Sequence, residues 1–157
     1  MRPVSSAMYR RILAPVDGSA ASSRGLREAI RLARSARGRL RLLHVVDEVA
    51  LIGGLDGAQY TADVFDAARD AGKRLLARSR LQAERGGVKA ETVLIESFAG
   101  RVADLIVREA RKWRADLLVL GTHGRRGLTR MVMGSDAELV VRAAPAPVLL
   151  LRATGRA

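Results

Sequence analysis

The sequence contains no cysteine, which excludes disulfides, thiolate catalysis and cysteine-ligated metal sites. Its two histidines, His44 and His123, are too few for a histidine-rich site, and no metal site is predicted. No apolar run approaches the roughly 20 residues that a membrane-spanning helix requires. Residues 1–8 also lack the apolar core of a secretion signal. By default, these absences predict a cytoplasmic protein with no membrane partner.

Aromatic residues make up only 3% of the chain, while the net charge is +12. A strongly basic protein invites a nucleic-acid interpretation, but few rings are available here to stack on single-stranded bases. Lysine occurs only at Lys73, Lys89 and Lys112, so most of the 28 basic residues are arginines, spread along nearly the whole chain. A general preference for arginine codons produces this pattern without a polyanionic partner. Nucleic acid binding is therefore not expected as the main role.

A chain of 157 residues fits one domain with one hydrophobic core. Short apolar runs bounded by turn residues predict strands, and apolar residues at helical spacing predict helices. The predicted strands are residues 11–16, 40–46, 88–95, 116–120 and 148–151. Four helices are predicted. The first starts at a cap on Ser19 or Ser22 and stops at Gly38, and the second covers residues 62–85. The third has its inner face from Val102 to Trp113, and the fourth covers residues 135–143. Residues 47–60 contain three glycines and are predicted to be a loop or mobile flap.

Strands that alternate with helices predict an α/β fold with five parallel strands in one open sheet and helices on both faces. Because parallel crossovers are right-handed, the sheet should be doubly wound, with its switch point beside the first strand. Ligands of such sheets bind outside the carboxyl ends of the strands. The loops after Val16, Val46 and Leu120 are therefore the places to look for a site.

The loop after the fourth predicted strand, residues 121–135, is rich in glycine and arginine. Glycine allows a backbone to approach a phosphate closely, and arginines such as Arg125 add charge-assisted hydrogen bonds. Ser135 and Glu138 match a capping box, which would place a helix N-terminus next to the loop. A helix N-terminus favours phosphate. From the residues alone, a phosphate site and a plain glycine-rich turn before a capped helix both remain open.

Over residues 9–152 the chain resembles the universal stress protein family. The ATP-binding signature of that family is two glycines separated by two residues, then nine residues, then glycine and serine or threonine. Gly121, Gly124, Gly134 and Ser135 match this spacing. Residues 12–19 and 145–150 are similar to the two ends of the family's sequence pattern. The resemblance implies a Rossmann-like fold of the adenine-nucleotide α-hydrolase kind, with a flexible extension at 1–8 and a tail at 153–157.

The resemblance also implies roles for individual residues. Asp17 would meet the ribose or adenine, Val45 would contact the base, and Ser135 would hold the phosphate tail. The alternative for Asp17 is a turn former, and His44 is a packed strand residue or a catalytic base. His123 could contact the nucleotide or simply be exposed. The full predicted nucleotide-binding set is Pro15, Val16, Asp17, Val45, Gly121, His123, Gly124, Arg125, Gly127, Gly134, Ser135 and Asp136.

The implied cofactor is ATP, with or without Mg²⁺, and the implied role is regulation or stress response through nucleotide occupancy. A slow ATPase or phosphotransferase that uses the same pocket is the alternative, and no catalytic residue is assigned. Asp136 stands where many relatives carry an apolar residue, and its charge would repel a triphosphate. Residues 148–151 follow Pro145 and Pro147, which suggests an edge strand. The resemblance implies that this strand forms a homodimer.

Overall fold

The computed structural model describes residues 9–53, 62–122 and 134–153. They form one sheet of five parallel strands in the order β3-β2-β1-β4-β5. The strands are β1 (Arg11–Pro15), β2 (Arg39–Asp47), β3 (Ala90–Ser97), β4 (Leu117–Gly121) and β5 (Val148–Leu151). The strand order confirms the predicted doubly wound sheet, because the chain leaves β1 first toward β2 and β3 and later toward β4 and β5.

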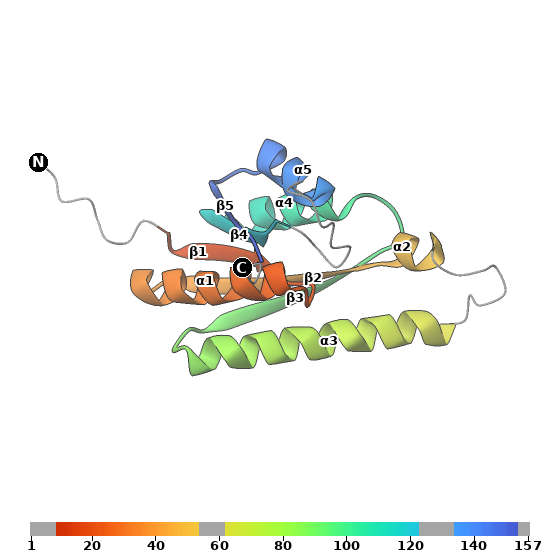
Figure 1. Cartoon of the computed structure of the whole chain (residues 1–157), viewed down its shortest axis with the longest axis horizontal. Helices are drawn as coiled ribbons and strands as arrows, with labels where there is room; N and C mark the ends of the chain where they lie inside the picture. Colours follow the sequence, from red (N-terminus) through yellow and green to blue (C-terminus); the bar gives the residue numbers. More distant parts are fainter. Residues whose placement is uncertain (1–8, 54–61, 123–133, 154–157) are drawn as a thin grey trace, which may run out of the picture.

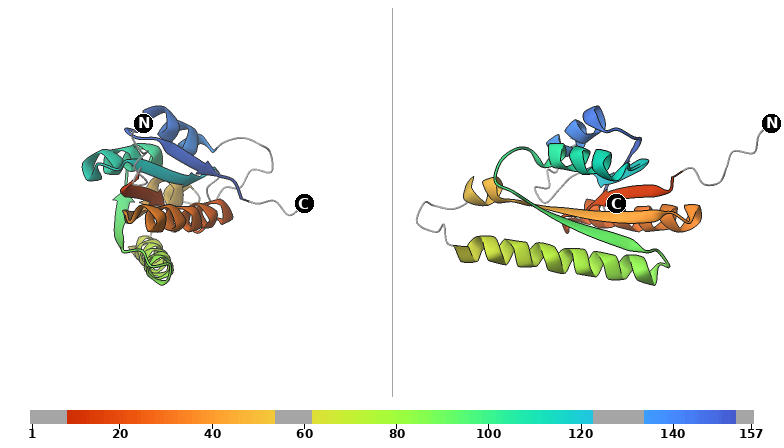
Figure 2. Two further views of the ribbon diagram at one scale, coloured as in Figure 1. Left: turned by 90° about the vertical axis from the view of Figure 1, so that its left-hand side faces the viewer. Right: turned by 180° about the vertical axis from the view of Figure 1, so that it is seen from behind.

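Helices cover both faces of the sheet, with α1 and α3 on one side and α4 and α5 on the other (Figures 1 and 2). The helices are α1 (Ala20–Ala36), α2 (Glu48–Gly53), α3 (Ala62–Arg85), α4 (Val102–Trp113) and α5 (Ser135–Ala143). Side chains alternate along β1: Ile12 and Ala14 pack toward α1 and α3, whereas Leu13 packs toward α4. The sheet therefore has a hydrophobic core on each face.

The short helix α2 differs from the predicted loop at residues 47–60. The side chain of Asp47 accepts a hydrogen bond from the N–H of Ala50 at 3.0 Å, which satisfies a free donor in the first turn. Glu48 to Ile52 then continue the helix up to Gly53. The glycines dominated the sequence interpretation, and the cap was missed.

At the N-terminus of α1, the predicted cap is confirmed at Ser19, whose side chain accepts from the N–H of Ser22 at 3.1 Å. The predicted stop at Gly38 is one residue late, because the left-handed residue is Arg37, with φ 51°. Gly38 has a different role. A Cβ there would lie 3.0 Å from the carbonyl oxygen of Arg10, so the chain needs glycine for close approach to the start of β1.

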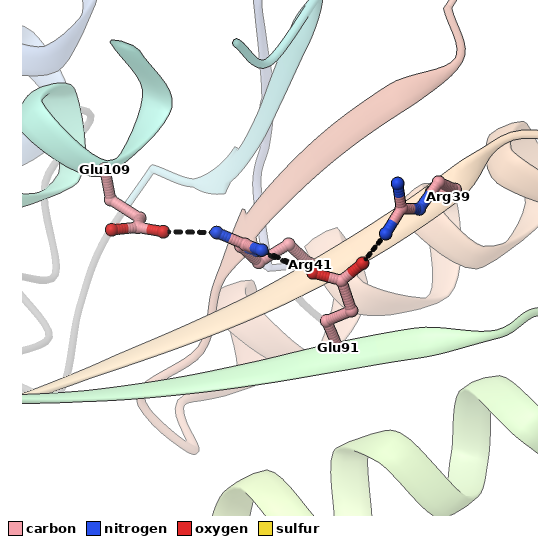
Figure 3. A network of polar contacts seen from close by, with 4 residues as sticks. All are labelled: Arg39, Arg41, Glu91 and Glu109. Atoms are coloured by element: carbon pink, nitrogen blue, oxygen red, sulfur yellow. Dashed lines mark hydrogen bonds and ion pairs between the residues drawn. The ribbon is translucent and has the colours of Figure 1, made fainter. Parts of the chain in front are cut away.

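A polar network joins β2, β3 and α4 on the α4 side of the sheet (Figure 3). Glu91 pairs with both Arg39 and Arg41, and Arg41 also donates to Glu109 at 2.6 Å. The Arg41 guanidinium lies over the ring of Trp113, 4.7 Å from its centroid. These contacts attach the edge strand β3 to the rest of the sheet.

No helix of the described residues is long and apolar enough to cross a membrane.

Candidate functional site

A cavity of about 550 Å³ opens at the carboxyl end of the sheet, where β1 lies between β2 and β4. Its size is in the range of small-molecule sites. The ends of β1, β2 and β4, the N-terminal end of α5 and the inner faces of α3 and α4 all contribute to its wall. The predicted site residues that line it are Pro15, Val16, Asp17, Val45, Gly121, Gly134, Ser135 and Asp136. The fold thus brings together residues that are more than 100 positions apart in the sequence.

Asp17 both holds a turn and lines the cavity. Its Oδ1 accepts a hydrogen bond from the N–H of Ser19 at 2.8 Å. Its own N–H donates to the hydroxyl of Ser22 at 3.0 Å. These bonds fix the chain as it leaves β1 and enters α1, as expected for the turn-former interpretation. Because the carboxylate also borders the cavity, the structure is compatible with both interpretations of Asp17.

His44 is part of the cavity wall and was not included in the predicted site. Its Nδ1 lies 2.7 Å from the carbonyl oxygen of Val16, so the ring of a β2 residue holds the end of β1. The ring is buried, with 9% exposure. It also packs against α3, because a Cβ on Gly72 would lie 2.7 Å from the ring atom Cδ2. His44 therefore fits the interpretation as a packed strand residue, and it also borders the cavity.

The inner side of α3 was also missed. Small and apolar side chains of this helix line the cavity, namely Ala68, Ala71, Gly72 and Leu75. Their signal in the sequence is a run of small residues on the inner side of a long helix. Such a run does not by itself distinguish close packing from an open wall.

Gly121 lies at the cavity, and its missing side chain has a packing cause. A Cβ there would stand 2.6 Å from backbone atoms of Ala21 and Ser22. Glycine at this position therefore lets α1 approach the end of β4. Four residues of the predicted set, His123, Gly124, Arg125 and Gly127, lie outside the described residues.

The described residues on either side of segment 123–133 are held together. The N–H of Gly134 donates to the carbonyl of Thr122 at 2.8 Å, and the N–H of Thr122 donates to the carbonyl of Leu151 at 2.8 Å. Thr122, directly after β4, and Gly134, directly before α5, therefore lie together beside the cavity. This arrangement agrees with the position predicted for the loop.

The predicted capping box at α5 is wrong. The helix begins at Ser135 with Gly134 as its N-cap, and no side chain makes a cap hydrogen bond. The N–H of Glu138 donates to the carbonyl of Gly134 at 3.0 Å, while the Glu138 carboxylate pairs with Arg142. Serine is therefore one position too late in the chain to act as the cap. The N-terminal end of α5 still lines the cavity, through Gly134 and Ser135 among others.

The described part of the cavity wall is acidic. Asp17, Asp47 and Asp136 line it, and the described wall residues include no lysine or arginine. Among the described residues, no group of three or more histidine, aspartate and glutamate side chains is placed to hold a metal ion. On the described part of the wall, the source of positive potential for a phosphate is the N-terminal end of α5.

Glu48 follows the cavity residue Asp47 and is almost fully buried, with 1% exposure. Its Oε2 has no hydrogen-bond partner among the described residues. Burial raises the pKa of this carboxyl, and the nearby charge of Glu96 raises it further, while Arg69 opposes the change. Arg69 itself holds Glu96 through two hydrogen bonds of 2.7 and 2.9 Å.

Comparison with known proteins relates the chain to one protein family. The sequence model of the universal stress protein family matches residues 8–152. Universal stress protein MJ0531 of Methanocaldococcus jannaschii is 34% identical over 145 residues, which cover 92% of this chain and 83% of that protein. A solved universal stress family protein from Burkholderia pseudomallei is 34% identical with a TM-score of 0.73, covering 92% of this chain and 97% of that chain.

Other solved structures share the fold at lower identity. Protein MJ0577 of Methanocaldococcus jannaschii has a TM-score of 0.81 at 23% identity and covers 95% of this chain and 99% of that chain. A universal stress protein solved in complex with cAMP has a TM-score of 0.66 at 22% identity, covering 94% and 99% of the two chains. One from Archaeoglobus fulgidus in complex with dAMP has a TM-score of 0.63 at 23% identity, covering 92% and 98%. At these identities the likeness concerns the fold.

Proposed function

Because the chain belongs to the universal stress protein family, we propose that it binds ATP and acts in regulation or stress response through nucleotide occupancy. The observation that carries this proposal is the cavity at the switch point of the sheet. Thr122 and Gly134, which flank segment 123–133 of the glycine motif, both line it. Relatives of the same fold bind the adenine nucleotides cAMP and dAMP. Their ligands support an adenine nucleotide here.

In this proposal the adenosine lies across the ends of β1 and β2. Pro15, Val16 and Val45 offer an apolar wall for the base, and Asp17 offers a carboxylate acceptor for ribose hydroxyls or the base. The phosphates lie toward Gly134 and Ser135, where the α5 N-terminus supplies free N–H groups. His123, Gly124, Arg125 and Gly127 would complete the phosphate side, with Mg²⁺ offsetting the charge of Asp136.

The experiment is a thermal melt with and without ATP and Mg²⁺. At about 100 times the dissociation constant, ATP stabilises the folded state by roughly 2.7 kcal/mol, which corresponds to about 5–11 °C in Tm for a domain of this size. Ala71→Trp fills the cavity and should abolish this shift. Ala67→Trp, on the exposed side of the same helix, should keep it. A shift retained by Ala71→Trp would place the ligand elsewhere.

The alternative is an enzyme that turns ATP over slowly. Phosphoryl transfer requires an oriented nucleophile and a stabilised transferring group, and uniform ground-state neutralisation of phosphate does not raise turnover. We expect phosphate release below about one per minute, against about 1–10³ per second for typical enzymes. Turnover near one per second that Ala71→Trp removes would instead establish an ATPase.

We also propose a cytoplasmic homodimer that pairs through β5. This strand is at the edge of the sheet and its four residues are all partly exposed, so its free backbone groups can pair with a second copy. Sedimentation should give a dimer, and Val148→Lys with Leu150→Lys a monomer with a native circular dichroism spectrum. A folded variant that stays dimeric would place the interface on another surface.

A further inference from the structure

Three helices of the protein end in the same kind of turn at the amino edge of the sheet, opposite the cavity. In each turn one residue is left-handed, and the next N–H donates to the carbonyl five residues back. These N–H groups are those of Gly38, Val88 and Ala115, at 2.8, 3.0 and 2.9 Å from their acceptors. The left-handed residues are Arg37 after α1, Gly87 after α3 and Arg114 after α4, with φ of 51°, 78° and 55°.

Arginine is an unfavourable choice for such a position. Glycine adopts positive φ without a Cβ clash, and this is why it predominates at left-handed helix ends. The turn after α3 uses glycine, whereas the turns after α1 and α4 use Arg37 and Arg114. The two arginine side chains are exposed and make no ion pair with the described residues. No local contact of the described chain therefore explains the two arginines.

The topology places these two arginines on either side of the start of β1. β2 and β4 flank β1, so the turns at Arg37 and Arg114 flank Arg10, which directly precedes β1. The N–H of Arg39 donates to the carbonyl of Arg10 at 2.7 Å, and Lys89 precedes β3 in the same way, accepting from Leu40 at 3.4 Å. We name Arg10, Arg37, Lys89 and Arg114 the amino-edge cluster. All four are exposed.

The carboxylates at this edge are already engaged. Asp116 accepts from the backbone N–H groups of Arg10 and Arg11 at 2.8 and 2.9 Å. Glu91 is held between Arg39 and Arg41 (Figure 3). Among the described ion pairs, none includes a member of the amino-edge cluster. The four cations of the cluster therefore make no ion pair with the described residues, and Asp116 is held by backbone N–H groups.

We propose that the amino-edge cluster binds the phosphate backbone of double-stranded nucleic acid without sequence preference. Adjacent strands are about 4.8 Å apart, so four strand starts form a row of cations about 14 Å long. Guanidinium groups bind phosphate in bidentate geometry. Of the large apolar side chains exposed on the described residues, Phe98 and Val49 follow the carboxyl ends of strands, whereas Leu81 and Val141 lie in the last turns of α3 and α5, toward the amino edge. The test below therefore includes anionic phospholipid as the competing polyanion.

This site is separate from the nucleotide cavity, and sequence composition could not indicate it. The arginines are spread along the chain, and only the fold brings positions 10, 37, 89 and 114 to one edge. Four phosphate contacts predict that the affinity for duplex DNA falls about 150-fold between 50 and 200 mM salt.

The test measures binding of a fluorescent DNA duplex at both salt concentrations. Arg37→Gly with Arg114→Gly keeps the fold, because glycine suits both left-handed positions, and it should reduce the salt effect to about 12-fold. The control Arg31→Gln with Arg80→Gln removes the same charge from exposed arginines that are already paired with glutamate. It should leave the 150-fold effect unchanged.

Equal salt effects in the two double variants would overturn the proposal, as would binding of anionic phospholipid vesicles in place of duplex. The Ala71→Trp variant should bind duplex like the unaltered protein. Loss of duplex binding in that variant would assign the nucleic acid to the cavity and reject the amino-edge cluster.

Discussion

His44 Nδ1 lies 2.7 Å from the carbonyl oxygen of Val16, and this contact links the middle of the sheet to the wall of the cavity. The carbonyl belongs to the last residue before Asp17, so the imidazole fixes the backbone from which the Asp17 side chain extends. The bond lies inside the fold, where an unsatisfied carbonyl is costly.

Replacement of His44 should therefore affect both stability and nucleotide binding. His44→Leu leaves the Val16 carbonyl unpaired and should reduce the free energy of unfolding by about 1–3 kcal/mol. His44→Asn keeps a donor near the position of Nδ1 and should lose less. Urea denaturation measures both variants, and an equal loss would show that ring packing matters more than the hydrogen bond.

Gly121→Ala tests why the motif glycine is required. Because its Cβ would stand 2.6 Å from the backbone of α1, we expect a loss of about 1–3 kcal/mol in unfolding free energy from overpacking. Gly53→Ala, at the end of α2 with no atom within 4 Å of the new Cβ, should be neutral or stabilising. An unchanged stability of Gly121→Ala combined with lost nucleotide binding would make the ligand the reason for this glycine.

Glu91 should make the protein sensitive to acid. The hydrogen bond from Arg41 is the main cause that holds the pKa of Glu91 below its ordinary value of 4.5, and Arg39 contributes. Its stabilising effect is therefore present above about pH 4.5 and is lost as the pH falls through the lower pKa of the folded protein. The Glu91 side chain is 36% exposed, so Glu91→Gln should lower the free energy of unfolding by about 1 kcal/mol at pH 7. The loss should be much smaller at pH 3. The control Glu84→Gln removes an exposed i,i+4 ion pair on α3 and should lower the free energy of unfolding by only about 0.3–0.5 kcal/mol at pH 7.

Glu48 should have the opposite dependence. Burial raises the pKa of its carboxyl, so the unfolded chain releases the proton at lower pH than the folded protein does. The stability therefore falls as the pH rises from the unfolded pKa through the folded one. Glu48→Gln should stabilise the protein at pH 8 and have little effect at pH 4. A variant that is less stable at pH 8 would show that the ionised carboxylate has a partner in the native state.

The periodicity of apolar residues was sufficient to predict all five strands and the four longer helices. It was sufficient because buried parallel strands and amphipathic helices have distinct patterns. The doubly wound arrangement, with its switch point beside the first strand, was also predicted from the chirality of crossovers, whereas the full strand order came only from the structure. Helix ends were less predictable. The cap of α1 was predicted at Ser19 or Ser22, and the structure has it at Ser19. Ser135 and Gly38 were each misplaced by one residue, since a one-residue shift leaves the pattern of side chains almost unchanged.

The candidate site was predicted from its motif residues, and Asp17, Gly134 and Ser135 do line the cavity. The contributions of His44 and Ala71 were not predictable in the same way. Each lies on an element whose inner face looks in sequence like ordinary core, and only the spatial arrangement shows that this part of the core is open. The packing role of Gly121 was hidden for the same reason, because α1 approaches it from a distant part of the chain.

The pairing of β1 with β4 also has a consequence for the order in which the protein acquires its properties. β1, β2 and β3 follow one another along the chain, whereas Ile12 pairs with Leu117 only after more than 100 residues have been synthesised. Contacts between such distant segments form slowly in folding because a long loop must close first. The cavity lies on this seam. A growing or partly unfolded chain can therefore have a native N-terminal half and still lack the binding site, so ligand protection should report completion of the whole sheet.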